Sequence, residues 1–268
     1  MSSLKRVLVC APVLLAGMAI LPQARAENPP PGAINCVEGH VTLDGQAAVA
    51  GETAMAGPGQ LLETQQGHAE ILLTPGAFLR MAENSAVKLD ASSPKSVRVE
   101  LVRGEVLVEM VQVDKLLSLD IVDKGADARL EKAGIYDFNA TQPAIAIYDG
   151  KVRVEDDRRV ISLGKGEELA LAGDGPLKPR KFNLTETNPV YAWSRQRADY
   201  DARASEWTAE SLIALDGASQ YATGWYWNPW FKSWAFMPAR PYRVSPFGYG
   251  YYAPNAPQYM APVFGDFR

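Results

Sequence analysis

The chain has 268 residues, of which 47% are hydrophobic and 22% are charged, and its formal net charge is −4 at pH 7. This composition is that of a globular protein, and the excess of acidic residues argues against a nucleic-acid partner, which would need a basic face. The two cysteines, Cys10 and Cys36, cannot form a disulfide framework of the kind that holds small secreted domains together.

The first 26 residues have the pattern of a signal peptide. Lys5 and Arg6 precede an apolar run from Val7 to Leu21, and Ala24 and Ala26 are the small residues that signal peptidase accepts. The run is about 15 residues long, shorter than the roughly 20 that a membrane-spanning helix needs, and no later run is long enough. We expect an exported protein, periplasmic or extracellular; an uncleaved anchor is the alternative. Cleavage would change the net charge from −4 to about −7.

Residues 36–172 consist of short β-rich runs separated by tight turns. Several runs alternate apolar and polar residues, as a strand does when one face is buried, and glycine-containing turns join successive runs. We therefore expect an all-β domain of antiparallel hairpins, arranged as a sandwich or as a solenoid. The hairpin turns are predicted at Asp44-Gly45, Arg103-Gly104, Asp149-Gly150 and Gly164–Gly166.

Four blocks of this region resemble the FecR-type sensor domain, a family typified by periplasmic proteins of iron-dicitrate signalling. The blocks stand in the family's order, and the resemblance covers about Val37–Leu171; they are Gly67–Leu89, Leu101–Val108, Ile147–Val154 and Leu163–Glu167. The resemblance implies a domain that binds or signals and does not catalyse. Sensor proteins of the family place a cytoplasmic sigma-regulating segment and a membrane helix before this domain, whereas a signal-peptide pattern precedes it here.

We find no motif for catalysis or for a cofactor. The glycines do not have G-x-G-x-x-G or P-loop spacing, and the Gly-x-Ser-x-Gly and His-Glu-x-x-His motifs are absent. Cys36 and His40 lack the second cysteine of a haem-attachment motif; they suggest a buried thiol beside a surface histidine, with a metal contact as the alternative. We expect no enzymatic activity, no cofactor and no metal. A paired acid/base site could still come from residues far apart in the sequence.

A linker and a helix are predicted after the β domain. Residues 173–187 form the linker because they are rich in Gly and Pro, and Asn188 followed by Pro189 fits a helix N-cap. With Gly217 as its stop, the helix covers residues 188–216. It is amphipathic, and its aromatic stripe must dock on the β domain or on a partner. The stripe recurs every seven residues and consists of Trp193, Tyr200 and Trp207.

Residues 217–268 form an aromatic tail rich in Pro and Gly. Aromatic side chains in a dense cluster suit stacking on sugar rings or on a protein partner, so they are the candidate binding residues; a small hairpin folded onto the domain is the alternative. From Pro238 onward aliphatic residues are few, and we expect an extended or disordered chain. The candidate binding residues are Trp225, Tyr226, Trp227, Trp230 and Trp234.

The sequence therefore predicts a non-catalytic exported binding or signalling module of the cell envelope, whose partner is an envelope protein or a glycan. A structural envelope protein, or one that binds glycan or peptidoglycan, is the first alternative. A glycan-acting hydrolase is the second.

Overall fold

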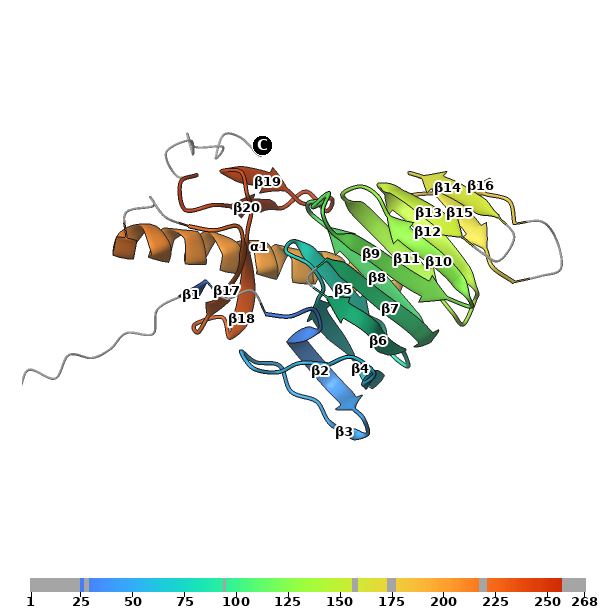
Figure 1. The fold of residues 1–268 in the computed structure, drawn as a ribbon, viewed down its shortest axis with the longest axis horizontal. Coiled ribbons are helices and arrows are strands. Elements are labelled where there is room, and N and C mark those ends of the chain that lie inside the picture. The colour runs from blue at the N-terminus through green and yellow to red at the C-terminus, as the bar shows by residue number, and fades with distance from the viewer. Residues whose placement is uncertain are drawn as a thin grey trace, which may run out of the picture.

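The computed structural model describes residues 25–26, 29–93, 95–155, 159–172, 177–216 and 221–256. It is a β-rich fold with one long helix among these residues, as expected from the sequence (Figure 1). The predicted signal peptide, part of the linker, the helix stop at Gly217 and the end of the tail lie outside the described residues. Arg25–Ala26 are the exception: they form β1, which pairs with β17 (Gly224–Asn228).

One sheet in the described part of the chain contains fifteen strands. Its strand pairs are antiparallel except for the parallel pair β7–β9. The strands are β2 (Ala33–Leu43), β3 (Gln46–Ala47), β4 (Leu61–Leu72), β5 (Ala77–Met81), β6 (Ala86–Ser93), β7 (Ser96–Arg103), β8 (Glu105–Met110), β9 (Ser118–Asp123), β10 (Ala126–Leu130), β11 (Gly134–Asn139), β12 (Ala144–Asp149), β13 (Lys151–Glu155), β14 (Val160–Gly164), β15 (Glu167–Ala170) and β16 (Arg180–Lys181).

The sheet folds over on itself into a sandwich of two rows. From the long strand β4, one row runs through β6, β7, β9, β10, β13 and β14, and the other through β5, β8, β11, β12, β15 and β16. Val99 and Ile121 of the first row share one buried core with Val108 and Phe138 of the second. The alternating pattern in the sequence thus arises because each strand turns one face toward this core. The arrangement is a sandwich.

Three of the predicted hairpin turns are corners between the two rows. The strands that they join, β7 and β8, β12 and β13, and β14 and β15, pair with other strands and not with each other. Gly104 shows why a tight turn is needed at a corner: its φ is +80°, and a Cβ there would lie 2.3 Å from the Ser85 hydroxyl oxygen. The hairpin at Asp44-Gly45 is confirmed, because β2 pairs with β3.

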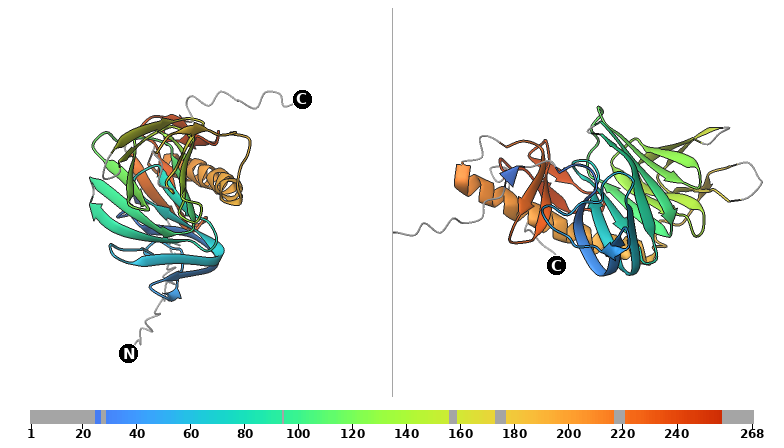
Figure 2. Two further views of the ribbon diagram at one scale, coloured as in Figure 1. Left: turned by 90° about the vertical axis from the view of Figure 1, so that its right-hand side faces the viewer. Right: turned by 60° about the horizontal axis from the view of Figure 1, so that its bottom comes forward.

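The predicted helix is α1 (Pro189–Asp216), and it runs along the outer face of the β5–β8 side of the sandwich (Figures 1 and 2). Asn188 is its N-cap, because its Oδ1 accepts a 2.9 Å hydrogen bond from the Tyr191 N–H. No helix among the described residues is long and apolar enough to cross a membrane.

A buried ion network joins α1 to the sandwich. Arg80 of β5 donates to Glu70 at 2.6 Å, to Glu109 at 2.7 Å and, across to the helix, to Asp201 at 2.9 Å. Arg197 of α1 donates to Glu70 at 3.0 Å and to Asp201 at 2.8 Å. Burial alone would raise the pKa of Glu70, but the two arginines lower it to about 2. The carboxylate of Glu70 is therefore the fixed anion between two cations.

A second polar contact holds the start of the helix. The Asn188 side-chain Nδ2 donates to Glu105 of β8 at 2.7 Å and to Asp137 of β11 at 2.6 Å. Burial, and then the neighbouring Glu105, raise the pKa of Asp137 well above its usual range, and burial also raises the pKa of Glu105. Ionisation of both carboxyls at the same time is therefore unfavourable.

The chain after the helix forms two hairpins that pack against it. They are β17 with β18 (Ser233–Met237), and β19 (Tyr242–Val244) with β20 (Gly250–Tyr252). Tyr251 is fully buried beside Phe78 of the sandwich, so the expectation of an extended or disordered chain after Pro238 is wrong for residues 238–256. Few aliphatic residues are needed here, because aromatic rings fill the space between helix and sandwich.

Candidate binding surface

The β17–β18 hairpin lies between the sandwich and α1, and both of its faces are covered. Trp225 and Trp234 point toward the sandwich, where they share a buried cluster with Phe78. Tyr226 points the opposite way and is buried against Ala204 of the helix. Because neighbouring residues of a strand alternate between faces, a hairpin between two layers buries nearly every side chain that it carries.

The five predicted binding residues therefore lie in different environments. Trp225, Tyr226 and Trp234 are buried. Trp227 is partly buried, with its ring centroid 5.6 Å from that of Trp234. Trp230, in the turn between β17 and β18, is 71% exposed. Among the five, Trp230 thus offers most of its side chain for contact with a partner.

The turn that carries Trp230 is anchored to the helix. The Asn228 side-chain Oδ1 accepts hydrogen bonds from the backbone N–H groups of Trp230 at 3.0 Å and Phe231 at 3.1 Å. Its Nδ2 donates to the Thr208 hydroxyl of α1 at 2.8 Å, and Thr208 in turn donates to the Ala204 carbonyl. The exposed ring is therefore mounted on a fixed backbone.

Two of the three residues of the aromatic stripe of α1 lie outside the interface between helix and sandwich. Trp207 is 57% exposed and Tyr200 is 37% exposed. Only Trp193 contacts the sandwich: its ring stacks on His68 with centroids 4.7 Å apart, and its Nε1 donates to Glu38 at 3.0 Å. Of the two alternatives that the sequence left open, docking of the stripe on the β domain holds only at this end.

Phe231 connects the turn to the helical stripe. Its ring centroid is 5.5 Å from that of Tyr200 and 6.1 Å from that of Trp207, both in edge-on contacts. The Tyr200 hydroxyl donates to the Phe231 carbonyl at 3.0 Å, and partial burial raises the pKa of Tyr200, which keeps that hydroxyl protonated. Phe231 thus joins Tyr200 to Trp207, and the exposed Trp230 precedes it in the same turn. We call these four residues, Tyr200, Trp207, Trp230 and Phe231, the aromatic surface.

Charged groups border the aromatic surface. The Arg197 guanidinium lies over the Tyr200 ring, 4.7 Å from its centroid, in a cation–π contact. Arg203 and Asp199 form an ion pair at 2.8 Å on the outer side of the helix. The surface therefore combines flat apolar rings with donors and acceptors of hydrogen bonds. That combination suits recognition of a polar partner.

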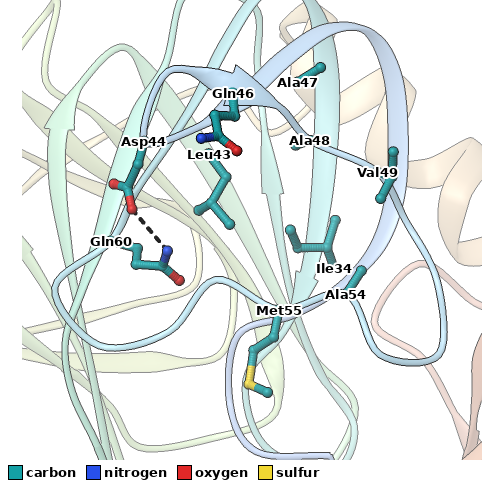
Figure 3. Close-up of a pocket in the computed structure, with 10 residues that line it drawn as sticks. All are labelled: Ile34, Leu43, Asp44, Gln46, Ala47, Ala48, Val49, Ala54, Met55 and Gln60. Atoms are coloured by element: carbon teal, nitrogen blue, oxygen red, sulfur yellow. Dashed lines mark hydrogen bonds between the residues drawn. The ribbon is translucent and has the colours of Figure 1, made fainter.

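A concavity of about 280 Å³ lies beside the β2–β3 hairpin, away from the aromatic surface (Figure 3). Asp44 accepts a 2.8 Å hydrogen bond from Gln60 in its wall, and the Leu61 N–H and Gln60 lower the pKa of Asp44. These bonds hold the turn in place. The lining residues are Ile34, Leu43, Asp44, Gln46, Ala47, Ala48, Val49, Ala54, Met55 and Gln60. Its mostly small apolar wall has no group suited to acid, base or nucleophilic chemistry apart from that occupied carboxylate.

Cys36 is not set up as a nucleophile. Burial raises the pKa of the Cys36 thiol to about 12, so the thiol is protonated at neutral pH, and its sulfur lies 3.8 Å from Glu38. His40 instead pairs with Gln65 at 3.1 Å. The residues that the structure describes contain no group of three or more His, Cys, Asp or Glu side chains that could hold a metal ion.

Comparison with known proteins finds no matching family model and no matching curated protein. Two solved structures from Parabacteroides distasonis are similar in part, and each is described as a "putative anti-sigma factor". The first is 18% identical, covers 50% of this chain and 64% of its own, and has a TM-score of 0.43. The second is 16% identical, covers 53% of this chain and 71% of its own, and has a TM-score of 0.42. At this similarity they assign neither family nor function to the chain.

Proposed function

We propose that this protein is a non-catalytic binding or signalling module that acts in the cell envelope after export, as the resemblance to the FecR-type domain implies. The observation that carries the proposal is the aromatic surface. Trp207 and Trp230 expose 57% and 71% of their side chains on elements that hydrogen bonds hold in place. Exposed tryptophans gathered on a fixed scaffold are typical of a recognition site.

The proposal changes which residues are expected to bind. Trp225, Tyr226 and Trp234 are buried, and removing them would damage the fold before it affected a partner. Trp207 and Trp230 are mostly exposed, so their side chains can be truncated with little damage to the core. They therefore allow recognition to be tested separately from stability.

The direct test is capture of a partner from a cell-envelope extract by the protein and by a Trp207→Ala/Trp230→Ala double variant. Truncation of a hot-spot aromatic costs about 2 kcal/mol or more, so loss of both should weaken a real contact about a thousandfold. Leu116→Ala/Val160→Ala is the matched control, because it removes two exposed apolar side chains of the sandwich. Equal capture by all three proteins would refute recognition by the aromatic surface.

Export is tested separately. The mature chain should begin at Glu27 and be recovered from a periplasmic or extracellular fraction, which N-terminal sequencing measures. Recovery of membrane-bound protein that still begins at Met1 or Ser2 would show that the N-terminal segment is an anchor.

A further inference from the structure

We propose that the aromatic row of α1, Trp193, Tyr200 and Trp207, binds an extended β-1,4-linked glycan chain by stacking on its sugar rings. The inference rests on the proposed function, because Tyr200 and Trp207 of this row belong to the aromatic surface and the inference names their ligand class. It follows from the spacing of the rings, from which side chains the surface exposes, and from the charges beside them.

The spacing of the row fits such a chain. Seven residues of α-helix rise about 10.5 Å, so three rings at seven-residue intervals span about 21 Å. The row turns by only about 20° per seven residues, so the rings project in nearly one direction. In an extended β-1,4-linked glycan each sugar is flipped relative to its neighbour, and the same face recurs at every second ring, at a distance close to this rise. Each ring of the row can therefore meet an equivalent sugar.

The exposed side chains favour a sugar over an aliphatic protein surface. Among the residues of α1 and the β17–β18 turn whose burial the structure describes, the large apolar ones left exposed are aromatic: Tyr200, Trp207 and Trp230. The exposed aliphatic residues lie elsewhere, as do Leu116 and Val160 on the sandwich. An aromatic ring gains by stacking on the C–H face of a sugar, and an aliphatic side chain offers no such flat face.

The rings are already oriented in the free protein. Trp193 is fixed between the His68 ring and the Glu38 carboxylate. Tyr200 is fixed by its hydrogen bond to the Phe231 carbonyl and by the guanidinium of Arg197 over its ring. Fixed rings lose little conformational entropy when a ligand binds.

Polar groups lie close to the row. Asp199 and Arg203 form an ion pair in the helical turns on either side of Tyr200, and the Glu38 carboxylate accepts a hydrogen bond from Trp193. Carboxylates accept and guanidinium groups donate hydrogen bonds, so hydroxyls of either orientation find a partner. Charges of both signs are present here, which suits a neutral chain better than a strongly charged polymer.

The test is titration calorimetry of the protein with oligomers of β-1,4-linked N-acetylglucosamine of increasing length, and with maltohexaose as the α-1,4-linked control. Three rings that stack on alternate sugars span roughly five sugars, so affinity should rise with length up to five or six sugars and then level off. Maltohexaose should bind at least about tenfold more weakly, because its coiled chain does not present one face in line. Equal affinity for the two hexamers would overturn the inference.

Substitutions locate the site. Tyr200→Ala and Trp207→Ala should each weaken binding of the β-linked hexamer about tenfold, and Trp207→Phe should recover most of the loss. Leu116→Ala should leave binding unchanged, and thermal melts should show that every variant is folded. Binding that does not respond to Tyr200→Ala and Trp207→Ala would place the ligand elsewhere and overturn the inference.

The inference and the proposed function fail separately. If no β-1,4-linked oligomer binds, yet the Trp207→Ala/Trp230→Ala variant no longer captures an envelope protein that the wild type does capture, the glycan inference is wrong and the proposed function stands. If neither oligomer binding nor capture involves these residues, both are wrong.

Discussion

The two sides of α1 have exchanged their usual roles. The side against the sandwich and the β17–β18 hairpin carries small and polar residues, among them Ala198, Asp201 and Ser205, all buried. The outer side carries Tyr200 and Trp207 of the aromatic row, whereas Trp193 stacks on His68 of the sandwich. A helix normally docks through its largest apolar residues. In this helix the periodic aromatic stripe identifies one face, but the stripe alone does not predict whether that face packs on the sandwich or is exposed. Small side chains let the helix approach closely, and paired charges supply the contacts.

The largest expected effect comes from breaking the inner side. Arg80→Met removes the cation that bridges Glu70, Glu109 and Asp201; it leaves the buried Glu109 carboxyl without its cation, and Glu70 and Asp201 keep only Arg197. We expect a loss of about 3–5 kcal/mol of unfolding free energy, measured by urea denaturation. Arg103→Met is the control, because its half-exposed pair with Glu63 should be worth about 1 kcal/mol or less. Similar losses in the two variants would mean that the network does not hold the helix.

A smaller effect is expected from the close approach of the helix. Ala204 is fully buried against the β17–β18 hairpin, so Ala204→Leu should overpack the contact and cost about 1–3 kcal/mol. Ala192 is exposed on the same helix, and Ala192→Leu should change the stability by less than about 0.5 kcal/mol. Thermal and urea unfolding of both variants measures the difference. Equal tolerance at both positions would show that this side of α1 is loosely packed.

The carboxyl pair at the helix start predicts a dependence of stability on pH. Because the pKa of Asp137 is raised in the folded protein, the stability that it contributes is fully present below its unfolded pKa, about 4, and is lost as pH rises through the higher folded value. Asp137→Asn keeps hydrogen-bonding groups beside Asn188 but cannot ionise, so the decline should become shallower; Glu105 supplies what remains. Urea midpoints across a pH series measure this. Exposed Glu52→Gln should leave the profile unchanged, and an unaltered profile in Asp137→Asn would contradict the assignment.

The smallest effect on stability is expected on the outer side. Trp207→Ala removes a mostly exposed ring from the solvent side and introduces a better helix former, so the unfolding free energy should change by about 1 kcal/mol or less. The same change should affect partner binding strongly. A stability loss as large as that of Arg80→Met would show that the aromatic row belongs to the core.

Local features of the fold could be predicted from the sequence. The Asn188–Pro189 start of the helix, the hairpin at Asp44-Gly45 and the period-two strands depend on neighbouring residues, and all are present. The corner at Gly104 could not be told from a hairpin, because the alternation shows which face is buried and not which strand is the partner. A corner and a hairpin would place the same residues on the core.

The site was harder to predict, because it depends on which layers meet. Trp225 and Trp230 are five positions apart in one aromatic cluster, yet one is in the core and the other in solvent. Only the position of the hairpin between helix and sandwich separates them. The Arg80–Asp201 pair joins residues 121 positions apart, and no local pattern signals it. A turn signal, Asn228-Pro229, does indicate that Trp230 lies at a hairpin tip.

The corners between the rows have a kinetic consequence. A strand that leaves a corner finds its partners in a different part of the chain, so the quick zipping of adjacent strands that starts many β proteins is blocked at Gly104 and Gly150. Pairing strands that are distant in the sequence costs loop-closure entropy before any core contact forms to offset it. The barrier to folding should therefore be high. Unfolding must cross the same barrier, so a slowly formed sandwich of this kind should also come apart slowly and survive long periods among proteases.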